Sequence, residues 1–267
     1  MFRTEDREKC QKLFERYYAG RKFHDTIYRE EIAKNLSSGV RLLDAGCGRY
    51  LKFSKEFANI AQVVGIDLER ALETNNANSP YGVRGNLDHL PFSSESFDLI
   101  ISRSVVEHLE HPRRVFQEFY RVLKPGGRAV LLTPNKYDYV SLIAAYTPYR
   151  LHRALVSRIF QVPADDVYPT LYRANTPSRF IKEMNAAGFQ QRRFQTINHY
   201  PAYLFFSPTL FRVGVLYERL TSLHLFRLLR GSLLGVFEKP AVPTGCSAIP
   251  ISERSTAQAS LGTIKHV

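Results

Sequence analysis

The sequence predicts an α/β fold, a doubly wound and mostly parallel seven-stranded sheet, from three observations. Short apolar runs alternate with stretches whose apolar spacing suits helices, which is typical of parallel strands joined by helices. One such run, 40–43, ends in Asp44 and a Gly-x-Gly turn at 46–48. The next run, 63–66, ends in Asp67, where folds of this class often place a ligand-binding acid.

Helices and strands are expected in a regular order along the chain. The first 36 residues favour helix, with an apolar face over 13–18. A helix is expected over 51–58, and another begins at Pro112, because the proline ring suits a first helical turn. Thr176 is a suitable cap for a later helix that stops at Gly188. The predicted strands are 40–45, 63–67, 81–86, 97–101, 128–133, 189–198 and 232–238.

Two interpretations of the turn at 46–48 are open: a ligand site, or a tight connection between strand and helix. Gly46 and Gly48 lack a Cβ, so the backbone can bend sharply and a ligand can approach closely. A following helix would direct unpaired N–H groups at that ligand. A dinucleotide fingerprint needs a further glycine at position 51, which is Leu51 here, with Tyr50 before it. A ligand smaller and less anionic than a pyrophosphate is therefore favoured.

The composition indicates one large domain. With 267 residues, 44% of them hydrophobic, the chain can bury a single α/β core. We place this domain at 1–240 and expect 241–267, rich in small and polar residues, to be a disordered tail. The cysteines at positions 10, 47 and 246 show neither disulfide nor metal spacing, which is typical of a cytoplasmic protein. The charged stretch 3–9 is unlike a signal peptide, and no window offers the roughly 18 apolar residues that span a bilayer.

The net charge of +12 is unevenly distributed. Segment 146–231 holds twelve Lys and Arg against four Asp and Glu, a net +8, which leaves +4 for the rest of the chain. Three interpretations compete: a solvated basic surface, attraction to anionic lipid headgroups at the inner membrane surface, or binding of a phosphate on a substrate. Nucleic acid is not expected as a partner, because the basic residues are dispersed and no binding module accompanies them.

Five sequence motifs occur in order between 40 and 134. They are Asp44-Ala-Gly-Cys-Gly48, Gly65-Ile-Asp67, Gly85-Asn-Leu-Asp-His-Leu-Pro-Phe92, Ser96-Phe-Asp-Leu-Ile-Ile101 and Val122-Leu-Lys-Pro-Gly-Gly127. This series resembles class I S-adenosylmethionine-dependent methyltransferases, which have a Rossmann-like fold, and within them the branch of the ubiquinone- and menaquinone-biosynthesis enzymes. Segments 133–189 and 201–240 show a looser resemblance to methyltransferases of bacterial polysaccharide pathways. In the family, the last two strands pair antiparallel.

The resemblance implies S-adenosylmethionine as cofactor and assigns its contacts by position. The residues that match the family's cofactor contacts are Asp44, Ala45, Gly46 and Gly48 for the methionine portion, Asp67 for the ribose, Leu68, Asn86 and Leu87 for the adenine, and Ser102 and Arg103, through backbone carbonyls, for the amino group. Two positions depart from the family. Asn86 stands where an aspartate is usual, although an amide oxygen still accepts a hydrogen bond. Tyr50 replaces the last glycine of the turn.

Two insertions, about 136–175 and 200–231, would shape the acceptor side of the sheet. Tyrosines and arginines of the first suit a sugar or another ring, although most of its tyrosines are expected to pack on the core. We predict that Tyr172, Arg173 and Asn175 face the acceptor. The second insertion carries apolar residues at helical spacing, for which core packing is preferred over an in-plane membrane contact. These residues are Val213, Leu216, Tyr217, Leu220 and Leu223.

The chemistry asks for a proton acceptor if the nucleophile is a hydroxyl. In the family, the Glu107-His108 pair lies near the methyl group, and His108 is the predicted base; a structural histidine is the competing interpretation. No metal is predicted, because Ser104 stands where metal-dependent relatives have a glutamate.

The predicted function is O-methylation of a hydroxyl on a glycan-pathway or lipid-linked small molecule. A quinone or isoprenoid ring methyltransferase and a cofactor-binding module without catalysis are the alternatives. Both methyltransferase interpretations require that the chain bind S-adenosylmethionine.

Overall fold

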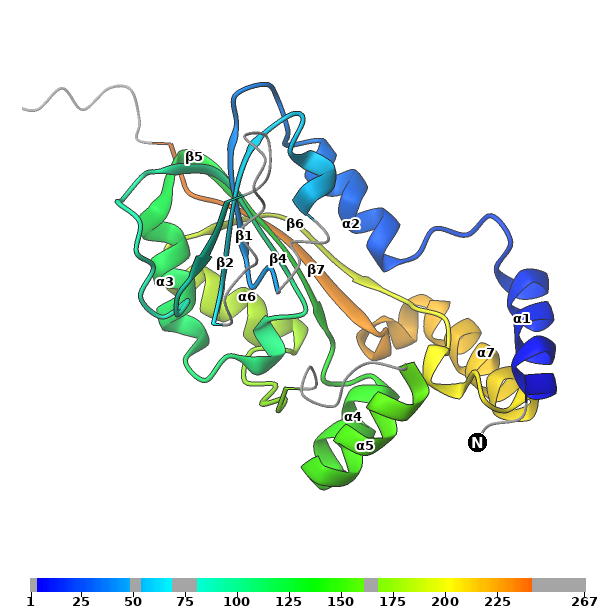
Figure 1. Cartoon of the computed structure of the whole chain (residues 1–267). Coiled ribbons are helices and arrows are strands. Elements are labelled where there is room, and N and C mark those ends of the chain that lie inside the picture. Colours follow the sequence, from blue (N-terminus) through cyan, green and yellow to red (C-terminus); the bar gives the residue numbers. More distant parts are fainter. Residues whose placement is uncertain (1–3, 49–53, 69–80, 161–167, 242–267) are drawn as a thin grey trace, which may run out of the picture.

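A computed structural model describes residues 4–48, 54–68, 81–160 and 168–241, and its centre is one seven-stranded sheet (Figure 1). The strands are β1 Arg41–Ala45, β2 Gln62–Asp67, β3 Tyr81–Arg84, β4 Phe97–Arg103, β5 Leu123–Pro134, β6 Gln190–Ile197 and β7 Ser232–Glu238. They lie in the order β3-β2-β1-β4-β5-β7-β6. Strands β1 to β5 pair in parallel, and β7 runs antiparallel to β5 and β6. The predicted fold class and the antiparallel last pair are confirmed, and each strand lies where it was predicted, except that β5 begins at Leu123 and not at 128.

Helices cover both faces of the sheet and extend beyond the carboxyl ends of its parallel strands (Figure 1). The α-helices are α1 Thr4–Tyr18, α2 His24–Ala33, α3 Pro112–Val122, α4 Tyr139–Tyr146, α5 Tyr149–Phe160, α6 Pro177–Ala186 and α7 Pro208–Ser222. Short 3-10 helices are η1 Ser54–Phe57, η2 Val106–His108, η4 Ala202–Leu204 and η5 His224–Leu229. The predicted insertions thus contain α4 and α5, and α7 with η5.

Alternation along the buried strands divides the core into two layers. Leu43 of β1 belongs to the layer that packs on α3 and α6, whereas Leu42 belongs to the layer that packs on α2 and η1. Helix α3 begins at Pro112 as predicted, and its buried stripe includes Phe116 and Phe119. The Thr176 side chain caps α6 by accepting a hydrogen bond from the Arg179 backbone N–H.

Two predicted segments lie wholly or partly outside the described residues. The helix expected over 51–58 is described only from residue 54, and there it is the single 3-10 turn η1. The tail 242–267 is not among the described residues, so the domain boundary at 240 stays a prediction. Within the described ranges, every helix is too short or too polar to span a bilayer.

The prediction that the apolar stripe of the second insertion packs in the core is wrong. Val213 and Leu216 are 57% and 68% exposed, whereas Phe211 and Val215 on the other side of α7 are buried. These two residues join Leu13 of α1 in a small core of their own. The reason is that α7 is apolar on two sides, and α1 covers only one of them.

Candidate functional site

The glycine turn after β1 has backbone angles that glycine adopts readily and other residues disfavour. Gly46 and Gly48 have φ angles of 80° and 65°, in the left-handed region that residues with a Cβ disfavour. A Cβ on Gly46 would lie 2.2 Å from Cγ2 of Val105, so this position also requires glycine for packing. A Cβ on Gly48 would meet no atom within 4 Å, so the space over this residue is open among the described atoms.

The glycine turn and the end of β2 are in direct contact. The backbone N–H of Gly48 donates to Oδ2 of Asp67 at 2.8 Å. The N–H groups of Gly46 and Cys47 both donate to the carbonyl of Ile66, at 2.8 and 3.2 Å. The acid predicted for the ribose therefore lies beside the turn predicted for the methionine portion, as one ligand that spans both would require.

Side chains at the end of β4 brace this region. Ser102 is buried, and its hydroxyl donates to the carbonyl of Ala45 at 2.8 Å. Arg103 makes two hydrogen bonds to the carboxylate of Asp25 in α2, at 2.8 and 3.0 Å. Burial alone would raise the pKa of Asp25, but Arg103, with smaller contributions from His24 and Arg29, holds that pKa below its usual value. Both side chains are thus structural, and their predicted cofactor contacts, through backbone carbonyls, stay a prediction.

The remaining predicted cofactor residues differ in exposure. Asp44 is buried at the end of β1, and Leu68 is 64% exposed directly after Asp67. Leu87 is buried in the core, and its adenine contact stays a prediction. The side-chain oxygen of Asn86 accepts the backbone N–H of Asp88 at 3.0 Å and so holds the local turn. An exposed leucine beside a strand-end acid suits the flat face of an adenine.

The thiol of Cys47 is held in its protonated form. Burial, with a contribution from the Asp44 and Asp67 carboxylates, raises the pKa of the Cys47 thiol well above its usual value. The thiol therefore stays protonated and unreactive at neutral pH. Within the described ranges, no three His, Cys, Asp or Glu side chains gather as metal ligands would.

A cavity of about 310 Å³ opens beyond the carboxyl ends of β4 and β5. It is lined by Ser104, Glu107, His108, Pro134, Asp138, Val140, Ser141, Ala144, Val156, Tyr168, Thr170, Tyr172, His199 and Tyr203. Ten of these fourteen side chains carry a polar group, and none is Lys or Arg. The lining therefore suits a neutral, hydroxyl-bearing molecule, and no basic side chain of the insertions is among the described residues that line it.

Glu107 and His108 form one wall of the cavity. Glu107 is 4% exposed, and its Oε2 accepts the hydroxyl of Thr133 at 2.9 Å. Its Oε1 lies 3.8 Å from Nε2 of His108, whose Nδ1 is 2.8 Å from the carbonyl of Pro169. Burial raises the pKa of Glu107, although the nearby His108 and the Thr133 hydrogen bond lower it in part. A raised carboxyl pKa beside a histidine in a cavity is typical of functional sites.

Of the three predicted acceptor residues, the structure places only Tyr172 in the cavity wall. Asn175 is fully buried, and its amide donates to Thr133 Oγ1 at 2.6 Å and to the Pro134 carbonyl at 3.0 Å. Arg173 turns to the carbonyl of Glu110 at 2.7 Å. The structure therefore does not place Arg173 and Asn175 in the wall of this cavity. Both side chains form hydrogen bonds with other groups of the protein instead.

Several residues of the cavity come from segments far apart in the sequence and were not predicted as site residues. Asp138 is buried at the start of α4, and its Oδ2 lies 3.5 Å from Nε2 of His199. Burial raises the pKa of Tyr203 to about 12, and it also raises the pKa of Tyr172. Both tyrosines therefore keep their hydroxyl protons and can donate hydrogen bonds into the cavity. No local pattern predicts that 138, 172, 199 and 203 meet.

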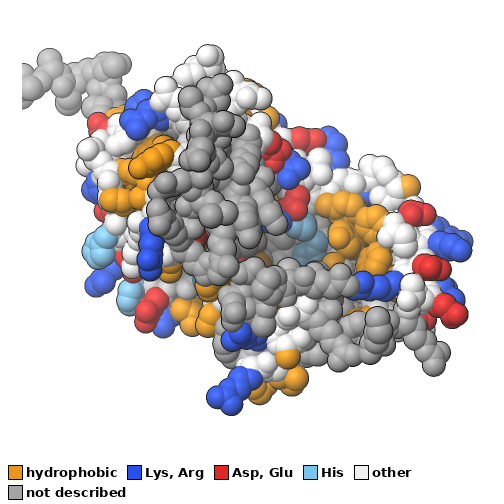
Figure 2. Space-filling model, in the orientation of Figure 1, with side chains coloured by type: hydrophobic (Ala, Val, Ile, Leu, Met, Phe, Trp, Pro, Cys, Tyr) orange, Lys and Arg blue, Asp and Glu red, His pale blue; other side chains and the backbone are white. Residues whose placement is uncertain are grey.

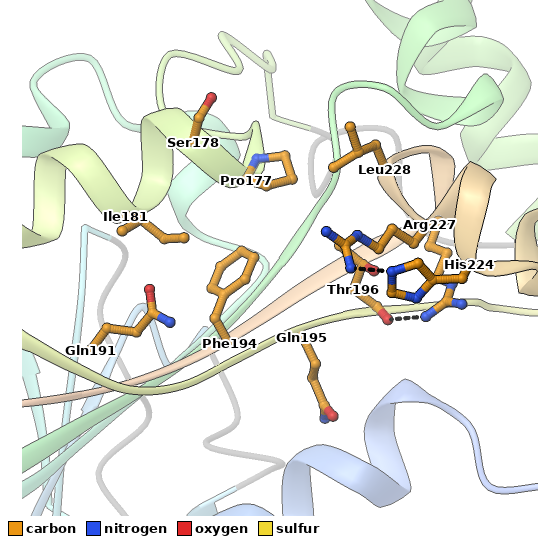
Figure 3. Close-up of a pocket in the computed structure, with 11 residues that line it drawn as sticks. Pro177, Ser178, Ile181, Gln191, Phe194, Gln195, Thr196, His224, Arg227 and Leu228 are labelled. Atoms are coloured by element: carbon orange, nitrogen blue, oxygen red, sulfur yellow. Dashed lines mark hydrogen bonds between the residues drawn. The ribbon is translucent and has the colours of Figure 1, made fainter.

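A second cavity, of about 500 Å³, lies between α6, β6 and η5 (Figure 3). Arg227 pairs there with His224 at 2.6 Å, and Arg230 donates to the backbone carbonyl of Thr196 at 3.3 Å. None of the predicted cofactor or acceptor residues lines this cavity. The cavity at β4 and β5, which Tyr172 and His108 line, is therefore the candidate acceptor site.

Comparison with known proteins agrees with this geometry. A family model described as a methyltransferase domain matches residues 43–131, which include the glycine turn, Asp67 and β4. Residues 43–131 thus match a methyltransferase domain. Members of this family use S-adenosylmethionine as methyl donor, so the predictions of family and cofactor are confirmed.

Relatives and solved structures extend the similarity. A demethylmenaquinone methyltransferase of Lactiplantibacillus plantarum is 28% identical over 61% of this chain and 74% of its own length. A ubiquinone/menaquinone biosynthesis C-methyltransferase of Pseudoalteromonas translucida is 28% identical over 65% of this chain and 76% of its own. A methyltransferase structure from Mesorhizobium loti has a TM-score of 0.52 at 19% identity, over 78% of this chain and 96% of that one. At this identity, the structural likeness shows the fold alone.

Proposed function

We propose that this methyltransferase domain transfers a methyl group from S-adenosylmethionine to a hydroxyl of a glycan-pathway or lipid-linked small molecule. The observation that supports the proposal most is the polar cavity at the carboxyl ends of β4 and β5, next to Glu107 and His108. It lies at the sheet edge where folds of this class bind their ligands.

The cofactor fits the residues at the glycine turn. The turn at 46–48 would hold the methionine portion, Asp67 the ribose hydroxyls, and the exposed Leu68 one face of the adenine. The sulfonium of the cofactor supplies a methyl group that is already activated. The protein therefore has to exclude water, align the acceptor and remove one proton.

His108 is the proposed proton acceptor. A carbonyl oxygen can only accept a hydrogen bond, so the Nδ1 atom facing Pro169 carries the ring proton. In the neutral ring this leaves Nε2 as the basic atom, on the side of Glu107. An acceptor hydroxyl would lose its proton to Nε2 as its oxygen bonds the methyl carbon, while the carbon–sulfur bond breaks and the sulfur would leave as a neutral thioether. The Glu107 carboxyl, when ionised, would stabilise the imidazolium that results.

The lining of the cavity favours a neutral hydroxylated group over a phosphate. Without Lys or Arg in the wall, and with Glu107 and Asp138 in it, the cavity would repel an anion. A phosphate of a lipid-linked acceptor would lie outside, where the basic residues of the insertions are exposed. We include peripheral contact with an anionic membrane in the proposal for this reason.

A quinone or isoprenoid ring is the second candidate acceptor. Its support comes from the names of the two relatives, which act in menaquinone and ubiquinone biosynthesis. Val140, Ala144 and Val156 provide an apolar side of the cavity on which a ring could pack. The polar majority of the lining is the reason for preferring a hydroxylated acceptor.

Two experiments test the proposal in sequence. Calorimetric titration of the purified chain with S-adenosylmethionine should show saturable binding, and absence of binding would reject both methyltransferase candidates. Incubation with an isotopically labelled methyl donor and extracts of lipid-linked sugars or quinones, followed by mass spectrometry, should show one labelled methyl group on a sugar-containing product. Labelled quinone would select the second candidate, and binding without any labelled product would favour a cofactor-binding module without catalysis.

A further inference from the structure

One surface of the second insertion is apolar and uncovered. Helix α7 and the following η5 carry large aliphatic side chains that are between 46% and 82% exposed. We call this surface the docking face, and its apolar members are Val213, Leu216, Leu220, Leu223, Leu225 and Leu228. Isolated exposed aliphatic side chains are ordinary on protein surfaces, but five leucines and one valine within sixteen residues of one segment are not.

The docking face follows from the helical periodicity of α7. Val213, Leu216 and Leu220 are spaced three and four residues apart, so they lie on one side of the helix. Phe211 and Val215 lie on the other side and pack on α1. The buried side of α7 is therefore formed without the docking face, whose side chains are not part of the core.

The charge of this segment has one sign at the surface. Between 208 and 230 the chain has four arginines and one acid, Glu218, a net +3. Glu218 is 4% exposed and accepts two hydrogen bonds of 3.0 and 2.8 Å from Arg21, which lies between α1 and α2. Arg212, Arg219 and Arg227 are exposed. The docking face thus presents aliphatic side chains and positive charge, with no exposed acid from its own segment.

We propose that the docking face binds an anionic lipid bilayer, with α7 lying in the plane of the interface. A helix of this kind inserts its aliphatic side chains between headgroups, while its arginines bind lipid phosphates. Complementary charge is what selects an anionic bilayer over a second copy of this basic chain, because two copies would bring like charges together. The role of this contact, which is to bring a lipid-linked acceptor to the enzyme, rests on the proposed function. Binding of the docking face to a bilayer does not, because it requires no methyl transfer.

The docking face is joined to the wall of the acceptor cavity. Tyr217 of α7 and Tyr139 of α4 pack edge to face, with ring centroids 4.9 Å apart. The Asn135 side chain, between β5 and α4, donates to the carbonyls of Leu228 and Arg230, both at 2.7 Å. Helix α4 lines the cavity. A membrane contact through α7 and η5 would therefore keep the cavity close to the bilayer.

The surface beside α7 has the same character. Ile143 and Tyr146 of α4 are 61% and 86% exposed. Hydrophobic and basic side chains occur together over α4 and α5, at the lower edge of the view in Figure 2. These helices extend beyond the carboxyl ends of the strands, as α7 does (Figure 1). An acceptor anchored in the bilayer could thus reach the cavity without leaving its lipid.

Flotation of the full chain with vesicles tests the proposal without cofactor or acceptor. Vesicles of phosphatidylcholine mixed with phosphatidylglycerol should bind the chain at low salt, and those of phosphatidylcholine alone should bind it far less. Arg212→Gln with Arg219→Gln should lower the partition coefficient about 25-fold, since each arginine near such a surface contributes about fivefold. Leu216→Ser with Leu220→Ser should lower it to a similar extent, and both variants should keep the wild-type S-adenosylmethionine affinity.

Matched controls come from exposed positions elsewhere in the fold. Arg114→Gln with Lys182→Gln removes the same charge from α3 and α6, and Ile60→Ser removes an aliphatic side chain that is 49% exposed. Neither control should change binding by more than about twofold, because neither alters the docking face and charges more than a Debye length away are largely screened. Failure to bind anionic vesicles, equal losses in the controls, or a dimer in sedimentation that Leu216→Ser dissolves would overturn the proposal. A chain that floats but binds no S-adenosylmethionine would contradict the proposed function and leave docking intact.

Discussion

The cofactor edge and the acceptor side of this molecule are constructed in different ways. The cofactor edge is the turn at 46–48 with the ends of β2 and β4, and backbone groups determine its shape. Gly46 and Gly48 adopt left-handed angles, and the Gly48 N–H binds Asp67 directly. The acceptor side is the cavity of about 310 Å³, whose shape depends on side chains contributed from residue 104 to residue 203.

The difference teaches which part of such an enzyme tolerates change. A turn whose φ angles and close contacts admit only glycine can accept few sequences. A cavity wall assembled from Tyr172, His199 and Tyr203 on separate segments can change one side chain at a time. Substitutions at the cofactor edge should therefore affect folding and binding together, and those on the acceptor side should affect turnover alone.

The largest effect is expected at the first glycine of the turn. Gly46→Ala forces a left-handed residue to carry a Cβ and drives that atom into Val105. We expect a loss of about 2–5 kcal/mol in unfolding free energy, from backbone strain and overpacking together, and loss of S-adenosylmethionine binding. Chemical denaturation and calorimetry measure the two quantities.

Gly126→Ala is the matched control for the turn. Gly126 has a φ of 78°, close to that of Gly46, but a Cβ there would meet no atom within 4 Å. It should lose only the backbone part, about 1–2 kcal/mol, and keep cofactor affinity. Equal losses in the two variants would show that contact with Val105 is not what makes position 46 special.

The next effect isolates the acceptor side. His108→Ala should lower methyl transfer by about 100-fold or more, because it removes the proposed base. Cofactor affinity should stay within about twofold of wild type, since His108 lies in the cavity wall and not at the glycine turn. Rates of labelled methyl incorporation and calorimetry give the two readouts. Unchanged incorporation would remove His108 from the mechanism.

A substitution at the end of β2 sharpens the cofactor side of the comparison. Asp67→Asn keeps the size of the side chain but removes the negative charge that accepts hydrogen bonds from the Gly48 N–H and, in the proposal, from the ribose hydroxyls. S-adenosylmethionine affinity should fall about 10- to 100-fold, the range for hydrogen bonds to a charged group. Asp98→Asn is the control, because Asp98 accepts the Arg41 backbone N–H at the other end of β4. Equal affinity losses in both variants would contradict the ribose assignment.

The sequence was sufficient for the sheet and the cofactor edge because their signals are local. A buried run followed by Gly46 and Gly48, and a second run that ends in Asp67, predict two strands and a ligand site that uses both, and in the structure Gly48 and Asp67 are in contact. The start of α3 at Pro112 and the cap at Thr176 were predicted in the same way, from residues a few positions apart.

The acceptor side was predicted less well because its arrangement depends on tertiary contacts. Nothing near Asn175 in the sequence indicates that its amide would bind Thr133, which lies 42 positions earlier. The apolar spacing of α7 predicted a helix but not which side would be covered, since α7 is apolar on two sides. Only the position of α1 against Phe211 decides that Leu216 is exposed.

The smallest effect concerns the pH dependence of the region where α2 meets the acceptor side. Burial lowers the pKa of His24 from its usual 6.5 to about 4, with Asp25 opposing and His199 adding to the shift. The folded state therefore keeps His24 neutral while the unfolded chain takes up a proton below pH 6.5. Stability from this residue is complete above pH 6.5 and is lost as the pH falls toward 4.

His24→Gln should therefore weaken the dependence of the unfolding free energy on pH below 6.5. Between pH 7 and pH 5 the wild type should lose about 1–2 kcal/mol more unfolding free energy than the variant, allowing for the partial exposure of the ring. Urea denaturation at the two pH values measures this difference. His111→Gln replaces an exposed histidine at the start of α3 and should leave the pH dependence of wild type unchanged. If the variant loses as much unfolding free energy between pH 7 and pH 5 as the wild type, the pH-sensitive group is not His24.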